Sequence, residues 1–230
     1  MKLFYKYFIL GFIIVAGCDN NDDQNAPDKG LDYFPVSTGQ YAIYDVEEIH
    51  YSTASEPDTI AYELMTVVTD SFANGAGGFT YVMHRSKRTT ETDDWEPMDT
   101  WSVRMDLREV VVNESNVSYL KLAFPLEEGT RWDGNKFNTL ASDEYEVKTY
   151  DARLSVNGLE FDRTLTVGQE AYDDEVTRTD IRTEVYARDV GLIRKESTVL
   201  TYCTEQVCLN QGFIDSGIIY KQEIREYGIQ

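Results

Sequence analysis

The chain has 230 residues, of which 41 are acidic and 21 are lysine or arginine, so its formal net charge at pH 7 is −20. Binding to nucleic acid needs clustered basic side chains that neutralise phosphates. No such cluster occurs, so the composition excludes nucleic acid as a partner and disfavours electrostatic adhesion to an anionic membrane. Hydrophobic residues make up 42% of the chain and 16 residues are tyrosine, which is enough apolar surface for a folded domain.

Residues 1–17 have the features of a signal peptide. Lys2 and Lys6 flank the start, and an apolar run of nine residues follows at 8–16. A membrane-spanning helix needs about 20 apolar residues, whereas the apolar core of a signal peptide is shorter. The alternative is a buried core helix, which does not explain why charge, apolar run, small residues and a cysteine follow one another in this order.

The apolar run leads into Cys18, and the phrase Val15-Ala16-Gly17-Cys18 resembles a bacterial lipobox. The resemblance implies that the thiol of Cys18 is acylated and that residues 1–17 are removed. Each buried methylene group contributes about 0.8 kcal/mol, so two or three acyl chains hold a protein stably on a membrane. We therefore expect a protein that is anchored to a membrane through Cys18 and does not span it.

Residues 18–32 are predicted to form the lipid anchor and a flexible acidic tether. The segment after Cys18 consists mostly of Asp, Asn and Gln and has too few apolar side chains to fold. Its acidic pair, Asp22-Asp23, resembles the surface-export signal of Bacteroidota-type lipoproteins. The resemblance implies an outer-membrane lipoprotein on the cell surface, and an anchor that faces the periplasm is the alternative.

From Tyr33 onward the hydrophobic pattern repeats every second residue, which is typical of β-strands. Turns rich in Asp, Asn and Gly separate about 11 expected strands, and Asn157-Gly158 is the strongest two-residue hairpin signal. One helical turn is compatible with residues 89–94. The strands are expected at residues 41–46, 60–68, 79–84, 100–105, 110–112, 117–124, 145–150, 161–167, 181–186, 192–202 and 218–227.

These strands predict a single all-β domain over residues 33–230. Each strand is expected to be antiparallel to the one before it, which makes a meander. A meander of this many strands curls into a half-barrel or barrel, and a two-sheet β-sandwich is the alternative. The charged positions of the strands are expected to face solvent.

The phrase at residues 34–41 recurs in outline at residues 124–132. Both copies read Phe-Pro-aliphatic-x-x-Gly and then reach an aromatic residue. Proline precedes or ends a strand, and glycine permits a positive φ. We interpret the echo as a recurrent turn at strand entry, and a duplication of two β halves is the alternative.

The first of these phrases, together with Tyr186–Glu196, resembles the phrases that open and close a broad set of uncharacterised bacterial lipoproteins. The chain departs from the opening phrase at Ala42 and Ile43, where tryptophan would be expected. The resemblance implies an antiparallel β domain similar to the LolA/LolB-like half-barrels. It implies no catalytic residue.

If Cys18 is acylated, Cys203 and Cys208 are the two remaining cysteines. Cysteines that face each other across a four-residue hairpin loop lie about 4.5–5.5 Å apart at Cα, within disulfide range. A redox-active pair would favour a Cys-x-x-Cys spacing at the start of a helix. We therefore predict a structural disulfide formed in an oxidising compartment.

No catalytic or metal-binding pattern stands out, and no cofactor is expected. His50 and His84 lie within strand patterns and lack metal-ligand spacing. Acidic pairs are so numerous that chance supplies them, so a carboxylate-based hydrolase is the least favoured function. Asp58-Thr59-Ile60 resembles the O-glycosylation pattern of Bacteroidota exported proteins, which makes Thr59 a candidate site, with an ordinary strand start as the alternative.

Three tryptophans, Trp95, Trp101 and Trp132, are candidates for a ligand or glycan surface, although β domains more often use such residues in the core or on strands. The sequence as a whole predicts a non-enzymatic, lipid-anchored envelope protein. Its β domain is expected to bind another envelope protein, a glycan or an apolar ligand. The alternative is a structural or assembly component of an outer-membrane complex.

Overall fold

The computed structural model describes residues 28–75 and 77–230. The predicted signal peptide, Cys18 and the acidic pair Asp22-Asp23 lie outside these residues. The described part holds one short 3-10 helix, η1 (Leu31–Tyr33), and twelve strands. The strands are β1 (Gln40–Ser52), β2 (Ser55–Ala73), β3 (Phe79–Arg88), β4 (Glu96–Met105), β5 (Glu109–Glu114), β6 (Val117–Ala123), β7 (Arg131–Asp133), β8 (Glu144–Val156), β9 (Leu159–Asp173), β10 (Arg178–Ala187), β11 (Gly191–Tyr202) and β12 (Ile214–Ile229).

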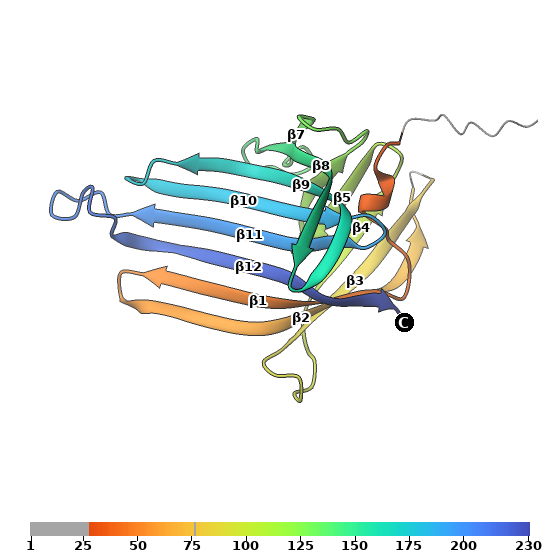
Figure 1. The fold of residues 1–230 in the computed structure, drawn as a ribbon, viewed down its shortest axis with the longest axis horizontal. Coiled ribbons are helices and arrows are strands. Elements are labelled where there is room, and N and C mark those ends of the chain that lie inside the picture. The colour runs from red at the N-terminus through yellow and green to blue at the C-terminus, as the bar shows by residue number, and fades with distance from the viewer. Residues whose placement is uncertain (1–27, 76) are drawn as a thin grey trace, which may run out of the picture.

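The strands form one antiparallel sheet in the order β6-β5-β4-β3-β2-β1-β12-β11-β10-β9-β8-β7. Strands that follow one another in the chain are neighbours, except at β6 and β7, and β12 pairs with β1. Figure 1 shows the long strands β9 to β12, β1 and β2 side by side, while β3, β4 and β5 run steeply across the right-hand end. The predicted meander is confirmed, and it forms a nearly closed barrel, not a sandwich.

The barrel is open between β6 and β7, where a few bonds replace a strand ladder. The backbone N–H of Leu120 donates to the carbonyl of Gly134 at 2.8 Å, and the indole Nε1 of Trp132 donates to the carbonyl of Leu120 at 2.9 Å. Gly134 has to be glycine because a Cβ there would collide with the ring of Tyr145. These contacts hold the two edge strands against each other.

Two local expectations differ from the structure. The strand β7 was not predicted, because its three residues, Arg131–Asp133, are too few to show an alternating pattern. Residues 89–94, where a helical turn was considered, form a non-helical connection between β3 and β4.

The alternating pattern that predicted the strands is visible in their burial. In β1, Ala42, Tyr44 and Val46 are buried, whereas Asp45 and Glu47 between and after them are exposed. Two apolar clusters result. One cluster consists of residues from the strands β4 through β10 and from the segment before β1. The other consists of residues from β1, β2 and the strands β8 through β12.

The turn Asn157-Gly158 joins β8 and β9 as predicted. Both residues have positive φ values, 50° and 80°, which is the backbone of a type I′ hairpin turn. The amide of Asn157 donates to Asp45 of β1 at 2.7 Å, and the ring of Phe161 lies 6.2 Å from that of Tyr227. The tip of this hairpin therefore packs against β1 and β12 and adds to the second apolar cluster.

The repeated phrase forms the same turn at both places. Gly39 and Gly129 have φ values of 90° and 84°, and each is the third residue of a turn that directly precedes a strand. The N–H of Gln40 donates to Ser37 at 3.1 Å, and the N–H of Thr130 donates to Glu127 at 3.0 Å. A glycine with positive φ at this place is typical of a type II turn, so the interpretation as a strand-entry turn is supported.

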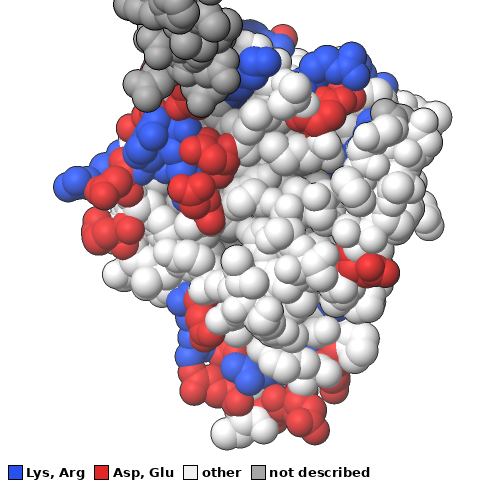
Figure 2. Space-filling view, turned by 90° about the vertical axis from the view of Figure 1, so that its right-hand side faces the viewer, with Lys and Arg blue, Asp and Glu red and all other residues white. Residues whose placement is uncertain are grey.

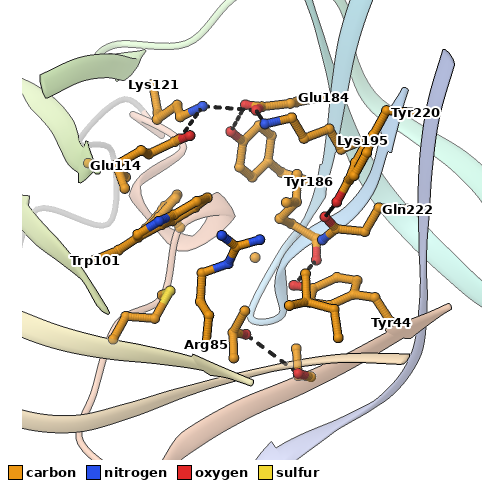
Figure 3. A pocket seen from close by; sticks show the side chains of 18 of the residues that line it. Tyr44, Arg85, Trp101, Glu114, Lys121, Glu184, Tyr186, Lys195, Tyr220 and Gln222 are labelled. Carbon is orange, nitrogen blue, oxygen red and sulfur yellow. Dashed lines mark hydrogen bonds and ion pairs between the residues drawn. The ribbon is translucent and has the colours of Figure 1, made fainter. Parts of the chain in front are cut away.

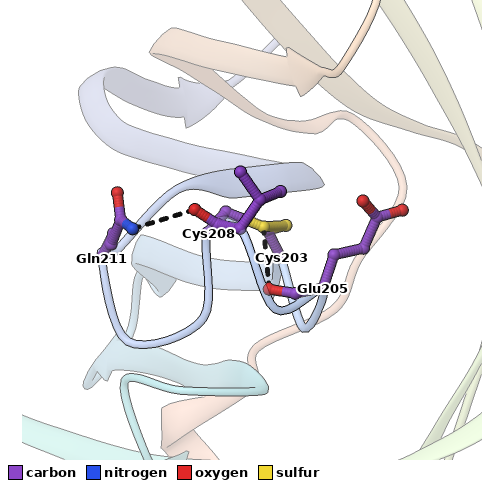
Figure 4. Close-up of a disulfide and its surroundings, with 5 residues drawn as sticks. Cys203, Glu205, Cys208 and Gln211 are labelled. Atoms are coloured by element: carbon purple, nitrogen blue, oxygen red, sulfur yellow. Dashed lines mark hydrogen bonds between the residues drawn. A yellow bond between two sulfur atoms is a disulfide. The ribbon is translucent and has the colours of Figure 1, made fainter.

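Cys203 and Cys208 form a disulfide, with 5.9 Å between their Cα atoms (Figure 4). The expected arrangement, in which the two cysteines face each other across a four-residue hairpin loop, is wrong. The connection between β11 and β12 runs over residues 203–213, and the backbone N–H of Cys203 donates to Phe213 at its base. Cys208 lies inside the connection, so the disulfide closes a smaller ring within a longer loop.

This arrangement predicts a modest, local role for the disulfide. Replacing both cysteines by serine removes a ring of about six residues, for which loop entropy gives a loss of about 2 kcal/mol in the free energy of unfolding. Urea denaturation of the Cys203→Ser/Cys208→Ser variant checks this value. A loss of the whole fold would contradict the local role.

Candidate functional site

The segment before β1 and the turn between β10 and β11 meet at one end of the barrel. The backbone N–H of Asp189 donates to the carbonyl of Asp32 at 2.8 Å. A Cβ at Gly191, whose φ is 96°, would lie 3.8 Å from Cδ of Pro35. The two phrases that the sequence analysis singled out at opposite ends of the domain are therefore neighbours in space.

Arg188 fastens this contact. Its guanidinium forms ion pairs with Asp28 at 2.6 Å, with Asp32 at 2.6 Å and with Asp151 at 2.9 Å, although only 7% of the side chain is exposed. The hydrogen bond from Arg163, and then Arg188, lower the pKa of Asp151 well below its usual value. Residues 28–32, which were assigned to the tether, thus bond to the domain.

Behind this contact, the interior of the barrel holds a cavity of about 630 Å³. Its lining comes from strands β1 to β6 and β10 to β12 and is mostly apolar. Phe34, Pro35, Val190 and Gly191 form its boundary at the end where the two phrases meet. Figure 2 shows that end of the molecule: charged side chains gather at the upper left, at the upper right and along the lower edge, and most of the surface between them is uncharged.

A buried ionic cluster forms one wall of the cavity (Figure 3). We call Glu114, Lys121, Glu184 and Lys195 the interior cluster. Lys121 Nζ lies 2.7 Å from Glu114 and 2.9 Å from Glu184, and Lys195 Nζ lies 3.5 Å from Glu184. Tyr186 donates its hydroxyl to the second oxygen of Glu184 at 2.5 Å. The whole side chains of Lys121 and Glu184 are only 8% and 2% exposed.

The cluster fixes its own protonation. Burial alone would lower the pKa of Lys121, but Glu114 and Glu184 outweigh it and hold the pKa above its usual value. Burial alone would raise the pKa of Glu184, but Lys121 and Lys195 outweigh it and lower the pKa. The pKa of Glu114 is lowered against burial by the same two lysines. All three groups are therefore charged at neutral pH.

Further polar groups, Arg85, Tyr220 and Gln222, line the cavity outside the interior cluster. Arg85 of β3 stacks on Trp101 of β4, with 4.0 Å between Cζ and the ring centroid, and donates to Asp99 at 3.0 and 3.2 Å. Tyr220 donates to the amide oxygen of Gln222 at 2.6 Å. Figure 3 shows the Arg85 guanidinium pointing into the space between Trp101 and these residues.

The three tryptophans have three different surroundings. Trp101 lines the cavity, as expected for a ligand-binding residue. Trp132 is buried in the first apolar cluster, and Trp95 stacks under Arg88 at 4.3 Å. Only one of the three candidates thus contributes to the cavity.

The other sequence candidates lie away from the ionic cluster. Thr59 is exposed on β2, where it pairs with Ile49, so its glycosylation stays a prediction. His50 bonds to Glu48 at 2.7 Å. Within residues 28–75 and 77–230, no group of three or more His, Cys, Asp or Glu side chains is placed to hold a metal ion.

The interior cluster was not predicted from the sequence. The charged strand positions were expected to face solvent, but the alternation of Lys121 with Leu120 and Leu122 is the same when the charged face lies inside a barrel. No signal in a single sequence separates the two cases.

The described part of the chain contains one helix, η1, and its three residues are too few to cross a membrane.

Comparison with known proteins gives fold neighbours. A solved protein of Bacteroides fragilis, described as exported and with a YmcC-like fold, aligns at a TM-score of 0.47 and 11% identity, over 85% of this chain and 98% of its own. A protein of Parabacteroides distasonis described as a lipoprotein aligns at a TM-score of 0.39 and 10% identity, over 85% of this chain and 98% of its own. No protein-family model and no curated protein matches the sequence.

The interior cluster predicts a large cost for removing its central charge. Lys121→Met leaves two buried carboxylates without their main partner, so we expect the free energy of unfolding at pH 7 to fall by about 3–5 kcal/mol. Lys148→Met is the control, because that lysine is exposed and pairs with Glu146 at the surface, and little change is expected.

The pH dependence has a defined sign. The lowered pKa values of Glu114 and Glu184 stabilise the fold above their ordinary pKa, near 4.3, and this stabilisation is lost as the pH falls through the folded values. Lys121→Met removes the cause, so the variant should be nearest to wild type in acid. Urea denaturation at pH 7 and pH 4 checks this, and a cost that grows in acid would contradict it.

Proposed function

We propose that the chain is a lipid-anchored envelope protein whose barrel binds a small, largely apolar ligand in its interior cavity. The observation that carries this proposal is the cavity of about 630 Å³ with a mostly apolar lining. Ligand pockets of proteins commonly have volumes of about 300–1,000 Å³, with apolar walls and a few placed polar groups. The cavity fits that description.

The size of the cavity limits the ligand. If each non-hydrogen atom occupies about 30 Å³, as in liquid water, the space holds roughly 20 such atoms. Leu64, Val68, Met83, Val112 and Leu192 provide apolar lining, and a smaller number of charged side chains, among them Arg85 and Lys195, provide the polar lining. A molecule with an apolar chain and one polar end matches this division.

The anchor is the second part of the proposal. Acylation of Cys18 and removal of residues 1–17 would leave residues 18–27 as the connection to the membrane. Ten residues span at most about 35 Å. The first described residue, Asp28, is bound to Arg188 beside the cavity boundary, so this end of the barrel would face the outer membrane.

A role in a larger assembly is the second candidate. It is favoured by Phe72 and Phe79, which flank the turn between β2 and β3 and are each 54% exposed. Exposed aromatic side chains at one end of a molecule are typical of contact surfaces. Such a surface is compatible with ligand binding and does not replace it.

A carboxylate hydrolase is disfavoured by the site chemistry. A general acid needs a raised pKa so that it keeps its proton at neutral pH. Two of the acids that line the cavity, Glu114 and Glu184, share Lys121 and have lowered pKa values. Neither is suited to donate a proton.

Filling the cavity tests the proposed function. Ser197 lines the cavity, whereas its neighbour Thr198 points to the other face of β11. Ser197→Trp should weaken binding of N-phenyl-1-naphthylamine, an uncharged probe that fluoresces in apolar surroundings, at least about tenfold. Thr198→Trp, the matched control, should bind like the wild type.

The outcomes separate the candidates. Native mass spectrometry of the wild type should show a bound small molecule that Ser197→Trp lacks. If the wild type binds neither the probe nor any small molecule, the ligand-binding proposal is wrong and the assembly candidate gains.

Protease treatment of whole cells tests the proposed location of the protein on the cell surface. The wild-type protein should sediment with outer membranes and be digested on intact cells, whereas Cys18→Ser should not sediment. Asp22→Ala/Asp23→Ala should sediment but become protected, and Asn20→Ala/Asn21→Ala serves as the control that changes no charge. Protection of the wild type on intact cells would rule out surface display.

A further inference from the structure

We infer that the ligand carries an anionic oxygen group, a carboxylate or a phosphate, and that Arg85 and Lys195 bind this group inside the cavity. The inference rests on the proposed ligand-binding function and adds the chemical class of the ligand. It follows from the hydrogen-bond donors of two cationic side chains that line the cavity.

Arg85 has hydrogen-bond donors to spare. A guanidinium has five N–H donors, and the two hydrogen bonds of Arg85 to Asp99 both come from Nη1. Its Nε is buried and has no hydrogen-bond partner among the described residues. A buried donor without a partner is costly, so an acceptor is expected in this part of the cavity when the site is filled.

Lys195 also has hydrogen-bond donors available for a ligand. Its Nζ lies 3.5 Å from Glu184, whose same oxygen is already bound by Lys121 at the shorter distance of 2.9 Å. An ammonium group has three donors. The side chain of Lys195 is 26% exposed, whereas that of Lys121 is 8% exposed, so Lys195 is the lysine of the cluster that a ligand reaches.

Two of the three carboxylates that line the cavity have little capacity left. Both oxygens of Glu184 are engaged, one by Lys121 and the other by Tyr186. Both oxygens of Glu48 are engaged as well, by Tyr62 and by His50, each at 2.7 Å. Two lining acceptors, Oε1 of Gln40 and Oε1 of Glu114, have no hydrogen-bond partner among the described residues, although Glu114 is ion-paired with Lys121. The inference therefore rests on the two cationic donors, Arg85 and Lys195, which a ligand that supplies anionic oxygens complements.

The position of Arg85 suits such a group. Stacking on Trp101 and bonding to Asp99 fix the plane of the guanidinium, so its remaining edge is pre-organised for a planar or tetrahedral oxyanion. Met83 and Val112 lie on the same lining and leave an apolar path for the rest of the molecule. A single-chain fatty acid or an alkyl phosphate has both parts.

Competition against the uncharged probe tests the inference. The protein is the mature chain from residue 18 with Cys18→Ser, so that no acyl chain of its own can occupy the cavity, and co-purified lipid is removed. The competitors are myristate, tetradecyl phosphate and tetradecanol, which share a chain and differ in the head group. We expect at least one of the two anions to bind about tenfold or more tightly than the alcohol.

Variants assign the preference to residues. Arg85→Gln should remove most of the preference for the anion and leave tetradecanol within about threefold of the wild type. Lys195→Gln should reduce the preference, and Arg85→Lys should restore part of it. Arg153→Gln, which removes the same charge from an exposed position, should change nothing.

The results distinguish failure of this inference from failure of the proposed function. If tetradecanol and both anions bind equally, or if Arg85→Gln and Lys195→Gln keep the preference, the cavity binds ligands but the anionic class is wrong. If the wild type binds neither the probe nor any competitor, both proposals are wrong. Probe binding by Arg85→Gln shows that the variant is folded, and a stronger preference for myristate or for tetradecyl phosphate tells carboxylate from phosphate.

Discussion

The pairing of β1 with β12 is the constraint on which the rest of the structure depends. It joins the two ends of the meander through thirteen residue pairs, from Gln40 with Ile229 to Ser52 with Ser216. About eight strands give a barrel interior that side chains can fill, and more strands leave space. A closed or nearly closed ring of twelve strands therefore contains a cavity for geometric reasons, and the side chains only decide its shape and chemistry.

The interior cluster shows how the chain uses this space. Two lysines and two glutamates balance in charge, and their bonds cross from β5 and β6 to β10 and β11. A buried ion pair is weak evidence for stability, since apolar residues of the same size often stabilise a core as well. Its value here is positional, because the bond between Lys121 and Glu184 joins β6 to β10, which are not neighbours in the sheet. Lys195 is held by this cluster, whereas Arg85 is held by Asp99 and Trp101.

The sequence allowed the fold to be predicted because the strands carry their own signal. The alternation at Ala42, Tyr44 and Val46, the hairpin at Asn157-Gly158 and the turn glycines are all local features, and each occurs in the structure where local chemistry requires it. The cavity is not a local feature. Lys121 and Glu184 are 63 positions apart in the chain, and their contact depends on how far the sheet curls, which no short pattern encodes.

The connection between the opening segment, residues 28–35, and the cavity follows from the position of Arg188. It comes at the end of β10, two residues before Val190, and binds Asp28 and Asp32 of the opening segment. Each of these carboxylates is partly exposed and one such pair alone would contribute little, but the arginine is buried and holds three of them together. The opening segment is therefore bound through Arg188 to the end of β10, the strand that also carries Glu184 of the cavity lining. The opening segment and the cavity lining thus keep a fixed relative position.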